Sequence, residues 1–117
     1  MVSVPAMAFE CLDSGLIPMV ESLSHQGWQY LGVCHPEGQT MVEPTKMYLE
    51  KTFRFPTFVD AVAFVNALTP LAENAGHHPD LVVGWGRVVV QLSTHDAGHR
   101  VTLKDVALAQ AFDHLVP

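Results

Sequence analysis

The chain has 117 residues and a mass of 12.8 kDa, the size of one domain with one modest hydrophobic core. Apolar residues make up 49% and charged residues 15%, which excludes a disordered chain, and the apolar runs are far shorter than the roughly 20 residues of a membrane-spanning helix. Six Lys and Arg against twelve Asp and Glu give a net charge of −6. This charge disfavours direct binding to nucleic acid and to anionic membrane surfaces.

The N-terminal third predicts a short helix and a strand after a loose lead-in. Residues 1–12 show no periodic pattern, and residues 13–117 are expected to form a single domain. Apolar residues at helical spacing predict a helix that Gly27 ends: Leu16, Ile17, Val20 and Leu23. A strand is expected over Trp28–Val33, followed by a loop over Cys34–Thr45.

Cysteine content and the N-terminal segment bear on the compartment. The chain begins with neither a basic segment nor a long apolar one, so we expect no signal peptide and a cytoplasmic location. Cys11 and Cys34 form no C-x-x-C pair and no disulfide framework. Reduced thiols are therefore expected, with a disulfide between the two as the alternative.

The central part predicts a strand and then a long helix. Apolar and polar residues alternate over Lys46–Phe55, as in a half-buried antiparallel strand, and only Lys51 interrupts the apolar face. The segment Thr57–Asp60 has the form of a capping box that begins a helix. Pro70 is expected to kink this helix, and Gly76 to end it.

The C-terminal part predicts two more strands and a last helix. The strands are expected over Leu81–Trp85 and Arg87–Ser93, with a turn at Gly84–Gly86. A second capping box, Thr102–Asp105, begins a helix that runs to about Leu115. This order of elements predicts an α+β fold, with a four-stranded antiparallel sheet and three helices packed on one face. The uncovered face suits self-association, so a homodimer or homotetramer is expected.

The candidates for chemistry are histidines, of which the chain has seven. His77 and His78 lie between a predicted helix and strand, and His95 follows a strand, where functional sites are usually built. Glu73 lies one helical turn before His77, so its carboxylate is expected to reach that imidazole. The structural alternative is a helix-ending turn whose imidazoles bond to the backbone, which Pro79 also favours.

Metal and nucleophilic chemistry are disfavoured. Adjacent side chains such as those of His77 and His78 diverge, and no zinc-type ligand spacing is present, so we expect neither a metal nor a cofactor. No serine lies in a nucleophile elbow, and Gly84–Gly86 is a turn between strands, not a phosphate-binding loop. Several histidines with one carboxylate are instead typical of general acid–base catalysis.

The spacing of these residues resembles the pterin-4a-carbinolamine dehydratase family. The shared pattern consists of Glu73, His77, His78, Pro79, Trp85, His95 and Asp105. The resemblance covers residues 45–115 well and 16–33 weakly, and it includes the segment Thr94–Gly98. The chain departs from the family after that segment, because Gly98-His99-Arg100 stands where the family usually has Gly-Gly-Leu.

The resemblance implies dehydration of 4a-hydroxytetrahydrobiopterin to quinonoid dihydropterin, a step in recycling the pterin cofactor after aromatic amino-acid hydroxylation. It implies that His77 and His95 are the acid–base pair and that Glu73 supports the histidines. An imidazolium gives the leaving hydroxyl a proton, and a neutral imidazole takes the N5 proton. No redox change occurs, so the reaction needs no cofactor or metal.

The resemblance also implies a set of substrate-binding residues. His78 would help to hold the pterin ring, and Pro79 and Trp85 would shape the pocket. Plain packing is an equal alternative for Trp85. Asp105 would either position His95 or cap the last helix.

A different class of function is the alternative. Some dehydratase-like proteins act without catalysis, as Rubisco assembly factors of the α-carboxysome or as partners of other proteins. The first 45 residues contain five acidic residues and no Lys or Arg, which is compatible with a protein client such as Rubisco.

Overall fold

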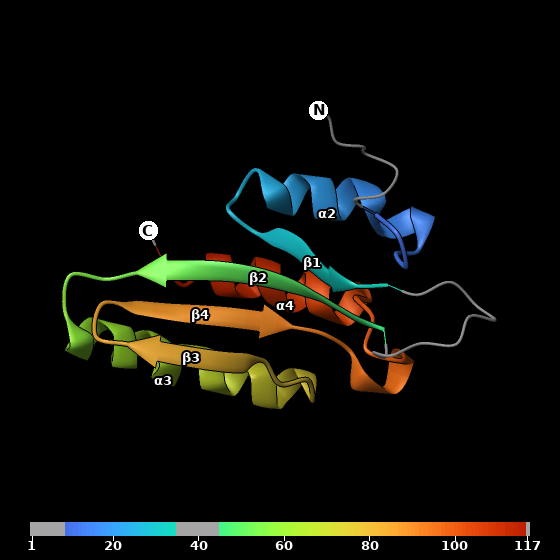
Figure 1. Ribbon diagram of the computed structural model, residues 1–117. Helices are drawn as coiled ribbons and strands as arrows, with labels where there is room; N and C mark the ends of the chain where they lie inside the picture. Colours follow the sequence, from blue (N-terminus) through green and yellow to red (C-terminus); the bar gives the residue numbers. More distant parts are fainter. Residues whose placement is uncertain (1–8, 35–44, 117) are drawn as a thin grey trace.

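The computed structural model describes residues 9–34 and 45–116, with a four-stranded antiparallel sheet packed against three α-helices (Figure 1). The elements in chain order are η1 (Ser14–Leu16), α2 (Ile17–Ser24), β1 (Gln29–Val33), β2 (Lys46–Arg54), α3 (Phe58–Ala75), β3 (Asp80–Gly84), β4 (Arg87–Leu92), η2 (His95–Ala97) and α4 (Leu103–Asp113). The predicted α+β class and order of helices and strands are confirmed. Most of the loop predicted at Cys34–Thr45 lies outside the described residues.

The sheet has the strand order β1-β2-β4-β3, and every neighbouring pair is antiparallel. The predicted alternation is confirmed, because Leu49 and Phe53 of β2 are buried beside Val88 and Val90 of β4. Figure 1 shows α3 and α4 on the far side of the sheet, and α4 contacts both α2 and α3. Buried apolar residues from all three helices and from β2 and β4 form one hydrophobic cluster.

Helix α3 carries the chain from β2 across to the far edge of the sheet, where β3 begins. The Thr57 hydroxyl oxygen accepts a hydrogen bond from the Asp60 N–H at 3.1 Å, as the capping sequence predicts. Pro70 lies inside the helix, which continues past it to Ala75. Gly76 then ends the helix in a left-handed conformation at φ 61°, so the next residues turn toward the sheet.

The structure explains why Lys51 interrupts the apolar face of β2: its charge is paired with Asp113. Its ammonium group contacts Asp113 Oδ1 of α4 at 2.7 Å, and Asp113 Oδ2 accepts a bond from the Trp28 indole N–H at 3.0 Å. The ammonium also lies 4.7 Å from the centre of the Phe53 ring. The cation is thus paired where α4 packs onto the sheet.

The segment before η1 packs onto β1 and is linked covalently to the residue that follows this strand. Phe9 stacks on Tyr30, and the Tyr30 hydroxyl donates a bond to the Glu10 carbonyl oxygen at 2.7 Å. Burial raises the pKa of Tyr30 to about 12. This packing brings Cys11 and Cys34 to a Cα–Cα distance of 6.0 Å, and they form a disulfide. The expectation of two reduced thiols is therefore wrong.

The face of the sheet away from the helices carries partly exposed apolar side chains, including Val82 at 54% exposure. The oligomeric state expected from this face stays a prediction. Among the described residues, no helix has the length and apolar character needed to cross a membrane.

Candidate active site

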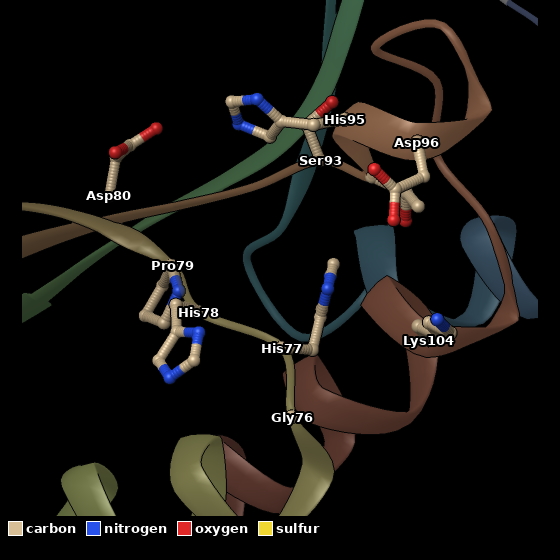
Figure 2. A pocket seen from close by; sticks show the side chains of 10 residues that line it. Gly76, His77, His78, Pro79, Asp80, Ser93, His95, Asp96 and Lys104 are labelled. Carbon is tan, nitrogen blue, oxygen red and sulfur yellow. The ribbon is translucent and has the colours of Figure 1, made fainter.

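A pocket of about 320 Å³ opens where the end of α3, the start of β3 and the segment after β4 meet α4. This volume lies in the range of small-molecule sites. Its lining residues are Gly76, His77, His78, Pro79, Asp80, Ser93, Thr94, His95, Asp96 and Lys104 (Figure 2). The pocket therefore brings together residues from three separate parts of the sequence: residues 76–80, residues 93–96 and Lys104.

His77 is the buried histidine of the pocket, at 8% exposure. Its backbone N–H donates to the Ala72 carbonyl oxygen at 3.2 Å as part of the turn that ends α3. Its ring Nε2 lies 2.5 Å from Asp105 Oδ1. In Figure 2 the His77 side chain points toward the segment that carries Ser93 and Asp96, whereas the His78 side chain points away from that segment.

Asp105 is fully buried in the first turn of α4. Its Oδ2 accepts bonds from the Thr94 hydroxyl at 2.7 Å and from the Thr102 N–H at 2.8 Å, and the latter completes a capping box. Of the two roles left open by the sequence, the carboxylate caps α4 and orients a histidine, but that histidine is His77 and not His95. In the tautomer with the proton on Nε2, His77 donates to this carboxylate, and Nδ1 is the ring nitrogen that remains as an acceptor.

Glu73 pairs with a different histidine from the one expected. Its Oε2 lies 2.5 Å from Nε2 of His78, and both side chains are more than half exposed. The expected contact with His77 assumes that the helix continues, but α3 ends at Ala75 and Gly76 turns the chain. The helical spacing of four residues therefore does not apply across this point.

His95 is exposed and begins η2, directly after the short bridge between Thr94 and Arg100. It lines the same pocket as His77 and His78, and so does Pro79. Trp85 does not line this pocket, because it lies in the turn between β3 and β4 with 71% of its surface exposed. Among the described residues, Trp85 has no place in this pocket, and the two roles expected for it stay predictions.

The sequence pattern assigns no individual role to four further residues of the site: Thr94, Asp80, Asp96 and Lys104. Thr94 holds Asp105, and nothing in the spacing of hydroxyl residues marks it before the tertiary contact is known. Asp80, Asp96 and Lys104 each line the pocket next to a residue of the predicted pattern. Their adjacency to that pattern was the available signal.

A comparison with protein families identifies the domain. The model of the family described as Pterin 4 alpha carbinolamine dehydratase matches residues 18–115. The chain belongs to this family.

Members from other organisms match the central and C-terminal part. A protein of Thermosynechococcus vestitus, assigned provisionally by its name as a pterin-4-alpha-carbinolamine dehydratase, is 52% identical over 67 residues, which are 57% of this chain and 70% of the relative. A Gloeobacter violaceus protein with the same provisional assignment is 54% identical over 63 residues, 54% of this chain and 67% of the relative.

Two solved structures share the fold. The crystal structure of a transcriptional coactivator/pterin dehydratase from Brucella melitensis has a TM-score of 0.67 at 26% identity, over 91% of this chain and 98% of that protein. A pterin dehydratase-like protein identified as a RuBisCO assembly factor in the alpha-carboxysome has a TM-score of 0.57 at 26% identity, over 78% of this chain and 90% of that protein.

Proposed function

We propose that this chain dehydrates 4a-hydroxytetrahydrobiopterin to quinonoid dihydropterin by general acid–base catalysis with His77 and His95. The observation that carries this proposal is the pairing of buried His77 with buried Asp105 at the wall of a pocket that His95 also lines. Membership of the dehydratase family supports the choice of substrate.

The proposed chemistry uses the free nitrogen of His77 as the base. Nδ1 takes the proton from N5 of the pterin, and the Asp105 carboxylate on Nε2 stabilises the imidazolium that forms. His95 gives a proton to the hydroxyl on C4a, the C4a–O bond breaks, and water leaves as the N5–C4a double bond forms. Exposed His95 regains its proton from solvent, and His77 returns its proton by the same route.

The binding roles follow the same geometry. His78 and Pro79 line the pocket, and we assign them the role of holding the pterin ring. Glu73 keeps the His78 ring in place through the 2.5 Å contact with Nε2, and so supports substrate binding and not the proton transfer itself. We propose no metal and no cofactor, since proton transfer and loss of water involve no redox change.

The test is a rate measurement with the carbinolamine generated in situ at neutral pH. We expect the protein to accelerate dehydration, and His77→Ala and His95→Ala each to lower kcat by at least about 100-fold. His25→Ala is the matched control, because His25 is exposed at the end of α2 and distant in the chain from the pocket residues. Full activity in both site variants, or no activity in the folded protein, would overturn the proposal.

A role in Rubisco assembly is the second candidate, because a dehydratase-like assembly factor shares the fold. The same rate measurement separates the two candidates, since an assembly factor without catalysis gives no acceleration. A Rubisco refolding assay with this protein then decides the second candidate, and an unchanged yield of assembled Rubisco would exclude it.

A further inference from the structure

His99 contacts the candidate catalytic residue His95. The centres of the two rings lie 4.6 Å apart, and the ring planes are tilted by 59°. His95 is exposed, whereas His99 is half-buried and does not line the pocket itself. Among the described residues, this ring contact is the one side-chain interaction that the structure gives His95.

The two rings meet because of the way the loop after β4 closes. The Thr94 N–H donates to the Arg100 carbonyl oxygen at 2.9 Å, so these residues form an antiparallel bridge. His95 and His99 lie just inside that bridge, in the loop that it closes, and their rings meet there. The chain returns through Gly98 at φ 73° and His99 at φ 57°.

His99 is the fixed member of the pair. Its carbonyl oxygen accepts a bond from the Met47 N–H at 2.8 Å, which ties it to the start of strand β2. Its ring Nδ1 is buried and has no hydrogen-bond partner in the described part of the chain. Both the left-handed backbone and the unpaired nitrogen cost free energy, and such costs concentrate at functional sites.

We propose that His99 is a positioning residue whose ring packs against His95 and fixes the orientation of the His95 imidazole at the pocket. The catalytic consequence rests on the proposed dehydratase function. The packing against His95 does not depend on that function, so it is tested separately.

The kinetic test compares His99→Gly with His99→Phe. Glycine removes the ring and relieves the left-handed strain, so the variant should be at least as stable as the parent. We expect its kcat to fall by about tenfold, because a loosely held acid is misplaced at the reacting atom, while KM changes by less than about twofold. Phenylalanine restores an aromatic ring and should restore kcat to within about threefold of the parent. An unchanged kcat in His99→Gly would overturn the catalytic part.

The direct test follows the His95 ring by carbon-13 NMR, with the resonance assigned by comparison with His95→Ala. In His99→Gly we expect a changed His95 Cδ2–H shift and a lower ring order parameter, and in His99→Phe a recovered order parameter. An unchanged order parameter in His99→Gly overturns the positioning role, even if kcat falls. If the parent protein shows no dehydratase activity, the proposed function fails, and this NMR comparison alone decides the role of His99.

Discussion

At the residue scale, the site depends most on one buried carboxylate. Asp105 accepts bonds from the Thr94 hydroxyl and the Thr102 N–H, and its other oxygen pairs with Nε2 of His77. Because three polar groups converge on this side chain, a substitution would leave buried polar groups without a partner. The same carboxylate thereby links the stability of α4 to the orientation of His77.

Asp105→Asn should destabilise the protein strongly although it preserves the shape of the side chain. The NH₂ group of asparagine is itself a donor, so it would face a donor at a position where the carboxylate oxygen accepted a bond. We therefore expect the free energy of unfolding to fall by about 2–4 kcal/mol, as measured by urea denaturation. Asp96→Asn is the control, because Asp96 is exposed and should change stability by less than about 0.5 kcal/mol. A loss below about 1 kcal/mol in Asp105→Asn would contradict the three-bond description.

At the element scale, β1 can pair with β2 only because of a glycine. Gly32 has φ 136°, and a Cβ placed on it would lie 2.0 Å from the Lys46 carbonyl oxygen and 2.8 Å from Met47 Cα. Both atoms belong to the backbone of β2, so no side-chain rotation relieves the clash. Gly32 therefore determines how closely the edge strand approaches its neighbour.

Gly32→Ala should lower the free energy of unfolding by at least about 2 kcal/mol, with an unchanged denaturant m-value if the fold persists. Gly15→Ala provides a matched control, since the nearest atom to its Cβ would be Asp13 Oδ1 at 3.7 Å. We expect that control to change stability by less than about 0.5 kcal/mol. Equal effects of the two substitutions in denaturation experiments would be inconsistent with the close approach at Gly32.

At the scale of the whole molecule, the disulfide closes the N-terminal segment onto the sheet. Cys11 precedes η1 and Cys34 follows β1, with 23 residues of sequence separation between them. The link therefore encloses α2, which contributes Val20 and Leu23 to the core. Its main effect is expected on the unfolded chain, whose freedom the link restricts.

Reduction of this disulfide should lower the free energy of unfolding by about 3 kcal/mol, the loop-closure value for a link of this separation. Guanidinium denaturation with and without dithiothreitol measures the difference. The double variant Cys11→Ser/Cys34→Ser should match the reduced parent and respond no further to dithiothreitol. Identical denaturation midpoints for the oxidised and reduced parent would show that the link does not stabilise the fold.

The sequence by itself determined the order of elements and most of their ends. Local patterns carry this information, because alternation, helix capping and glycine stops act over a few residues. Thr57 and Gly76 bound α3 as predicted, and the alternation in β2 identified its buried face. Four residues that line the pocket were also named in advance, because their spacing matches the family to which the chain belongs: His77, His78, Pro79 and His95.

Only the tertiary structure decided which side chains meet. The turn at Gly76 directed Glu73 to His78, and the packing of α4 brought Asp105 to His77. The packing of elements likewise joins Lys51 to Asp113 and Cys11 to Cys34. The closing of the loop after β4 joins His95 to His99. Contacts of this kind depend on the relative placement of elements, which local periodicity does not encode.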